Sequence, residues 1–126
     1  VGGGVGGVEL ALALHARAAR ARRSARISLV DAGPRILAPW RPGAARRVRD
    51  LLHSRGIVVR EGVAVTAVGA DDVALADGAR LPSRLTVWVT GAAPPPLLGR
   101  SALPRDARGY LRVDATLRAA DGSTLW

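Results

Sequence analysis

The sequence predicts an α/β fold in three layers, with a parallel β-sheet and, in addition, an antiparallel β-meander. Three observations support this prediction. A glycine-rich turn at residues 2–7 runs directly into an amphipathic helix. A short apolar strand that ends in an acid follows the helix. Farther along the chain, short apolar runs are separated by Asp and Gly, as in β-hairpins.

The composition excludes several function classes. The chain has 126 residues and is 48% hydrophobic, which suits the core of one soluble globular domain. It contains no cysteine, so this chain cannot build a disulfide framework, a thiolate nucleophile or a zinc finger. No apolar run approaches the roughly 18 residues of a membrane span.

The net charge of +9 does not by itself indicate a nucleic-acid partner. Every basic residue is arginine, in a chain rich in alanine, glycine and proline, which favours codon bias in a GC-rich genome as the cause. Aromatic residues make up only 3% of the chain, too few for the stacking surfaces of single-strand binders. We therefore expect no nucleic-acid partner.

The opening glycines fit the pattern G-x-G-x-x-G through Gly2, Gly4 and Gly7. In this pattern the first glycine allows a sharp turn, the second lets backbone approach a pyrophosphate, and the third lets the helix pack closely on the sheet. Backbone N–H groups and the helix dipole then hold the phosphates. The turn predicts a dinucleotide site, provided that a helix and an acid-terminated strand follow.

Both follow. We expect a helix from about residue 6 to 23 and a strand at residues 27–30 that ends at Asp31. Asp31 stands 24 residues after Gly7, close to the roughly 20-residue interval of a ribose-binding acid. A carboxylate there accepts bonds from ribose hydroxyls and repels a 2′-phosphate, which favours NAD(H) over NADP(H). Arg35 leaves NADP(H) open as the coenzyme, because its side chain can either lie against adenine or bind a 2′-phosphate.

The remaining chain supplies a second helix and further strands. We expect the helix at residues 44–54 and a strand at 57–59, then short strands of an antiparallel meander at 63–68, 73–75 and 79–81. Residues 85–89 lack alternation and predict a strand buried on both faces, with Trp88 in the core. We expect this strand to end in Thr90 and Gly91 at the same crevice as Gly2 and Asp31.

These residues resemble a known family almost end to end. The match lies in residues 2–9, 30–37, 77–78, 87–94 and 109–114, in the family's order. The chain resembles the pyridine-nucleotide-binding domain of two-dinucleotide-binding flavoproteins, a group that includes type II NADH dehydrogenases and pyridine nucleotide-disulfide oxidoreductases. The resemblance implies a Rossmann-like NAD(P)H-binding domain at residues 1–94 that lacks most of its first strand. Residues 95–126 would return toward the FAD-binding domain.

The resemblance also implies a function, in which NADH is bound and its hydride is presented to a flavin. FAD would be bound mainly by parts of the protein outside this chain, and the electron acceptor stays open among a quinone, a disulfide, an iron–sulfur protein and oxygen. No catalytic residue and no metal ligand is expected within the chain. The predicted cofactor-binding residues are Gly2, Gly3, Gly4, Val5, Gly6, Gly7, Glu9, Asp31, Arg35, Thr90 and Gly91.

Only Val1 precedes the glycine turn, and the chain ends just before the point where the family carries its flavin motif. We therefore expect a piece of a longer flavoenzyme that is inactive alone. Two alternatives remain open: a flavoprotein domain fused to selenide, water dikinase, and a non-catalytic NAD-sensing module. Cytoplasm is the expected compartment. Peripheral membrane association through other parts of the protein and a homodimer also stay open.

Overall fold

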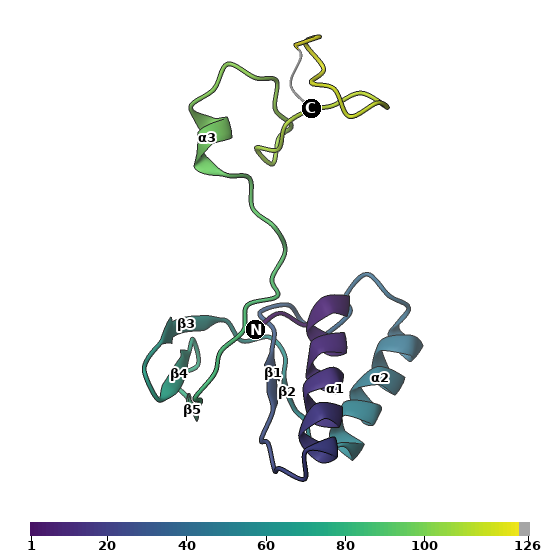
Figure 1. Ribbon diagram of the computed structural model, residues 1–126, viewed down its shortest axis with the longest axis vertical. Helices are drawn as coiled ribbons and strands as arrows, with labels where there is room; N and C mark the ends of the chain where they lie inside the picture. Colours follow the sequence, from purple (N-terminus) through teal and green to yellow (C-terminus); the bar gives the residue numbers. More distant parts are fainter. Residues whose placement is uncertain (124–126) are drawn as a thin grey trace. The chain divides into compact units, whose positions relative to one another are not determined.

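The computed structural model describes residues 1–123, so Trp126 and its two preceding neighbours lie outside the described residues. The chain divides into two compact units, of which the first is Val1–Thr90 and the second begins at Gly91. Figure 1 shows the elements of both units along the chain. In order they are α1 (Val5–Arg20), β1 (Ser28–Val30), α2 (Pro42–Ser54), β2 (Val58–Arg60), β3 (Val65–Val68), β4 (Asp72–Leu75), β5 (Arg80–Pro82) and α3 (Pro96–Gly99).

The first unit has the predicted three layers. β1 and β2 pair in parallel, and both α1 and α2 lie on one side of them, whereas β3, β4 and β5 lie on the other side (Figure 1). Successive side chains of a strand point to opposite faces. Leu29 therefore packs in the core beneath the helices, while Val30 packs in the core beneath the meander. The α/β class with a parallel sheet and an antiparallel meander is confirmed.

The helices are held by apolar residues on one face. Val8 and Ala11 of α1 and Ala45 and Leu52 of α2 are buried with Leu29 of β1. The predicted end of α1 near residue 23 was three residues too late, because Ala21 caps the helix and Arg22 adopts a left-handed φ of 51°. α2 begins earlier than predicted, at Pro42, where proline's fixed φ suits the first turn of a helix.

The meander is a three-stranded antiparallel sheet in the order β3-β4-β5. Val73 and Leu75 of β4 point inward and are buried with Val63 and Val30. Arg80 donates two hydrogen bonds to the carboxylate of Asp72, at 2.7 and 2.8 Å, which joins β5 to β4 and holds the pKa of Asp72 below its usual value. Short strands with turn residues between them were predicted here, and the meander is confirmed.

The prediction of a buried strand at residues 85–89 was wrong. No strand forms there, and Leu85, Val87 and Trp88 are exposed rather than buried, so Trp88 is not a core residue. Two backbone hydrogen bonds join the segment to Val1: the Val1 nitrogen donates to the Val87 carbonyl, and the Val89 N–H donates to the Val1 carbonyl. An apolar run becomes a doubly buried strand only where strands and covering layers surround it, and those contacts are long-range.

The second unit is built mostly from turns. α3 is a single short helix, and two isolated bridges join Arg105 to Leu111 and Val113 to Ala119. The Tyr110 hydroxyl donates a hydrogen bond to the Ala92 carbonyl. Local bonds stabilise the turns themselves, since the carboxylates of Asp106 and Asp114 accept hydrogen bonds from the N–H groups of Arg108 and Thr116.

Candidate functional site

The N-terminus of α1 is the centre of the candidate site. The first helical bond runs from the Val8 N–H to the Gly4 carbonyl, and no side chain caps the helix start. The N–H groups of the first turn therefore have no intrahelical acceptor, and the positive end of the helix dipole lies at the same place. Val5 and Gly6 are exposed there. This helix end offers donors to an anion.

Three of the glycines in this turn are required by the fold. Gly2 has a φ of +112°, and a Cβ built on it would lie 2.6 Å from the Val89 carbonyl oxygen. A Cβ on Gly7 would overlap the Gly2 carbonyl oxygen, and one on Gly3 would overlap the Asp31 carboxylate. The sequence pattern predicted close packing at the third glycine, and Gly7 has that geometry.

Gly4 differs from those three glycines. A Cβ built on Gly4 would have no atom of the protein within 4 Å, and the backbone is extended, with φ −72° and ψ −177°. Any L-residue can adopt this conformation without strain. The fold therefore does not explain a glycine here, whereas a phosphate lying against the backbone would.

Asp31 lies directly beside the turn, as the spacing predicted. It follows β1, and its two carboxylate oxygens accept hydrogen bonds from the Gly3 N–H and the Gly33 N–H, both at 2.7 Å. A carboxylate can accept about four hydrogen bonds, so two bonds leave acceptor capacity for ribose hydroxyls. Asp31 also fixes the turn, because it holds the Gly3 backbone from the side.

Arg35 lies in the loop after Asp31 but binds the loop itself. Its guanidinium donates to the carbonyl oxygens of Leu37, Ala38 and Trp40, at 3.2, 2.5 and 2.8 Å. The side chain is half-buried. Its terminal nitrogens thus already have acceptors, and a contact with adenine or a 2′-phosphate stays a prediction.

The other predicted cofactor-binding residues are Thr90, Gly91 and Glu9, and of these Thr90 lies beside the turn. Thr90 is exposed, and its backbone N–H lies beside Gly2, since a Cβ on Gly2 would be 3.0 Å from that nitrogen. Glu9 is exposed on α1. α1 has no acid in its first turn, so Glu9 lies beyond the part of the helix where a carboxylate favours the dipole most. Gly91 begins the second unit.

Glu61 lies close to the site and was not among the residues predicted from the sequence. It follows β2, accepts a hydrogen bond from the Ile36 N–H at 2.8 Å, and forms an ion pair with Arg49 of α2 at 3.1 Å. The one feature of the sequence that could have indicated Glu61 is its position directly after a strand, which Asp31 also has. The contact with Ile36 joins residues 25 positions apart, which no local pattern predicts.

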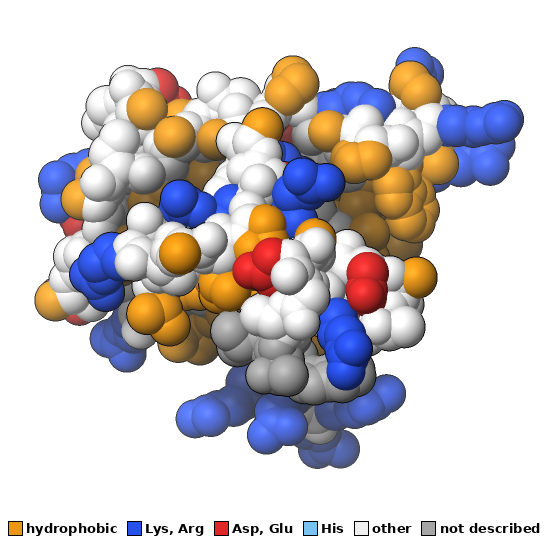
Figure 2. All heavy atoms as spheres, turned by 90° about the horizontal axis from the view of Figure 1, so that it is seen from above, with side chains coloured by type: hydrophobic (Ala, Val, Ile, Leu, Met, Phe, Trp, Pro, Cys, Tyr) orange, Lys and Arg blue, Asp and Glu red, His pale blue; other side chains and the backbone are white. Residues whose placement is uncertain are grey.

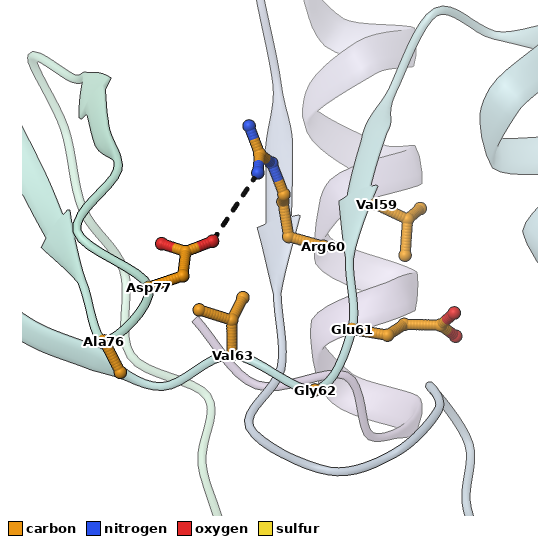
Figure 3. Close-up of a pocket in the computed structure, with 7 residues that line it drawn as sticks. All are labelled: Val59, Arg60, Glu61, Gly62, Val63, Ala76 and Asp77. Carbon is orange, nitrogen blue, oxygen red and sulfur yellow. Dashed lines mark ion pairs between the residues drawn. The ribbon is translucent and has the colours of Figure 1, made fainter.

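A hollow of about 580 Å³ lies at the carboxyl end of β2, beside the turn between β4 and β5. Figure 3 shows Arg60 and Asp77 facing one another across it, as an ion pair with atoms 3.9 Å apart. The Glu61 side chain points the other way in this view. Both charged groups of the pair are more than 40% exposed, so their interaction is weak, and the hollow shows no grouping suited to acid–base chemistry.

Arginine side chains gather at several places on the face shown in Figure 2, where acidic side chains are fewer. Among residues 1–123, no helix is long and apolar enough to cross a bilayer. The same residues contain no cluster of three His, Cys, Asp or Glu side chains that could hold a metal ion.

A glycine turn that leads into a helix N-terminus, with an acid beside it at the end of the strand that follows the helix, defines the dinucleotide-binding class of α/β proteins. The family model described as pyridine nucleotide-disulphide oxidoreductase matches residues 1–123. The chain belongs to this family.

The chain is also similar in sequence and in structure to individual known proteins. Demethylphylloquinone reductase NdbB of Synechocystis is 35% identical over 127 residues, covering 98% of this chain and 30% of that protein. The internal alternative NAD(P)H-ubiquinone oxidoreductase A1 of Solanum tuberosum is 30% identical, covering 94% of this chain and 25% of that protein. The crystal structure of a ferredoxin reductase from Rhodopseudomonas palustris superposes with a TM-score of 0.71 at 28% identity, covering 84% of this chain and 26% of that one. The chain thus spans between 25% and 30% of the length of each.

Proposed function

We propose that residues 1–94 bind NAD(H) within a FAD-dependent NAD(P)H oxidoreductase. The observation that supports this most directly is the uncapped N-terminus of α1, where the Gly4 backbone faces open space beside the Asp31 carboxylate. The N–H groups of the first turn would hold the pyrophosphate, and Asp31 would accept hydrogen bonds from the adenosine ribose. When bound, NADH would supply hydride chemistry toward a flavin, and the residues named here would hold and orient it.

NAD(H) is the preferred coenzyme in this proposal. A 2′-phosphate beside Asp31 would place two negative groups together, and the nearby guanidinium of Arg35 is engaged by three carbonyls of its own loop. Thr90 and Gly91 would lie toward the nicotinamide end, with Glu9 near it. Residues 95–126 would lead toward the flavin domain.

A quinone is the proposed class of electron acceptor. Two relatives carry quinone substrates in their names, a demethylphylloquinone reductase and an NAD(P)H-ubiquinone oxidoreductase. The residues that contact an acceptor would belong to other parts of the protein, as would the main FAD contacts.

The Gly4→Ala variant of the full-length protein tests the nucleotide site. The KM for NADH should rise tenfold or more, on the order of 1.4 kcal/mol of lost binding, because the added carbon occupies space next to the pyrophosphate. Flavin content and thermal stability should stay unchanged, since no protein atom meets the new Cβ. NADH is titrated against the flavin-loaded fraction, and unchanged affinity there would contradict the proposed site.

A further inference from the structure

The loop after Asp31 is held in a conformation that it would not adopt alone. Leu37 has a left-handed φ of 51° and is buried, with only 3% of its surface exposed. For a bulky residue this backbone region is strained and persists only where surrounding contacts impose it. Something outside the loop must therefore fix residues 36 and 37.

One of those contacts comes from the glycine turn. The Leu37 N–H donates to the Gly3 carbonyl at 2.7 Å, and a Cβ built on Gly3 would lie 2.8 Å from Cγ2 of Ile36. Ile36 is almost fully buried, at 1% exposure. The loop and the phosphate-binding turn therefore share one packed contact, so a shift of Ile36 is transmitted to Gly3.

The other contact comes from Glu61. Its Oε1 accepts the Ile36 N–H at 2.8 Å, and its Oε2 receives Arg49 Nη1 at 3.1 Å. The Glu61 side chain is only 19% exposed, and a hydrogen bond to a partly buried charged group is stronger than a bond between neutral groups. Figure 3 shows the carboxylate pointing away from the Arg60–Asp77 pair. Glu61 thus holds the backbone N–H of Ile36, the residue whose side chain lies against Gly3.

We propose that Glu61, fixed by Arg49, is a positioning residue for the adenosine half of the nucleotide. It acts through Ile36, which contacts both Glu61 and Gly3 and so links the Asp31 loop to the phosphate-binding turn. Glu61 itself contacts no nucleotide in this proposal. The inference rests on the proposed function, because it assigns Glu61 a role at the same NAD(H) site.

The test measures the two halves of the nucleotide separately in the full-length protein. Glu61→Ala should raise the dissociation constant of ADP-ribose and the KM for NADH about tenfold, because Ile36 loses a charged hydrogen-bond acceptor. The binding of reduced nicotinamide mononucleotide and the kcat at saturating NADH should change by less than about twofold. Glu61→Gln retains an oxygen acceptor for the Ile36 N–H and should recover most of the ADP-ribose affinity.

Asp72→Ala is the matched control. It removes an ion pair of the meander with atoms 2.7 Å apart, and among the described residues the Asp72 carboxylate makes no hydrogen bond to residues 31–37. ADP-ribose binding should not change in this variant. Equal weakening by Asp72→Ala and Glu61→Ala would overturn the positioning role, since both variants would then act through general stability.

Arg49→Leu tests the positioning role of Glu61 if the Glu61→Ala variant does not fold. This variant frees the Glu61 carboxylate without removing it, and about a threefold loss of ADP-ribose affinity is expected. Wild-type affinity for ADP-ribose in folded Glu61→Ala, or in Arg49→Leu where the first does not fold, would overturn the inference. The wild-type protein separates this result from a failure of the proposed function: if wild-type protein binds neither NADH nor ADP-ribose, the nucleotide site itself is wrong.

Discussion

The two helices that cover the sheet begin in similar ways but in different surroundings. Neither α1 nor α2 has a side-chain cap, and a Cβ on Gly4 or on Gly43 would meet no atom within 4 Å. The start of α1 is nevertheless tied to the strands, through the Gly2 N–H to the Val30 carbonyl and the Gly3 N–H to Asp31. The start of α2 follows an exposed loop and relies on Pro42.

This comparison shows what distinguishes a candidate binding site from an ordinary helix start. Free N–H groups and open space are present at both helices, because every helix leaves its first N–H groups without intrahelical partners. Only α1 starts at the carboxyl ends of parallel strands with an acid beside it. Three substitutions test whether this difference has the consequences that we assign to it.

Gly7→Ala should have the largest effect. The new Cβ would overlap the Gly2 carbonyl oxygen, and neither the turn nor the first residues of α1 can move without losing contacts to the sheet. We expect roughly 3 kcal/mol or more of lost stability, with little folded protein. Thermal unfolding monitored by circular dichroism measures it. A wild-type melting temperature would show that the turn is more adaptable than its packing indicates.

Asp31→Asn should have an intermediate effect. We expect kcat/KM for NADH to fall about tenfold and kcat/KM for NADPH to fall much less, because only NADH offers a free 2′-hydroxyl. The amide would also place a donor opposite the Gly3 or the Gly33 N–H, which costs about 1–3 kcal/mol of stability. Kinetics with both coenzymes must therefore be measured on folded protein. Parallel changes for the two coenzymes would remove Asp31 as the ribose ligand.

Gly43→Ala should have the smallest effect and serves as the control for Gly4→Ala. Gly43 lies inside α2, where alanine is favoured over glycine by about 1 kcal/mol, and the new Cβ meets nothing. Stability should rise slightly, and the KM for NADH should not change. If Gly43→Ala weakens NADH binding as Gly4→Ala does, the distinction between the two helix starts is wrong.

Local signals in the sequence were enough to predict most of the first unit. Gly2, Gly4 and Gly7 together with the spacing to Asp31 predicted the turn, α1 and the acid beside it, since each depends on neighbours in the chain. The meander was also predicted, because Asp and Gly separate its strands. The family membership followed from the same residues.

Long-range contacts account for what the sequence did not predict. Trp88 is apolar and was assigned to the core, but its burial depends on which elements cover residues 85–89. The arginine-rich end of α1 favours helix by propensity, yet a turn at Arg22 ends it. Glu61 was missed because its contact with Ile36 exists only after β1 and β2 pair.

The bonds of Arg35 have a consequence for how this site could evolve. A lineage that adopts NADPH must neutralise Asp31 and must also gain a cation for the extra phosphate. Arg35 is the nearest arginine along the chain, but recruiting it would release the carbonyls of Leu37, Ala38 and Trp40 that it holds. With NAD(H) as the proposed coenzyme, a change to NADPH would therefore need a cation other than Arg35 beside the ribose, because Arg35 already holds its own loop.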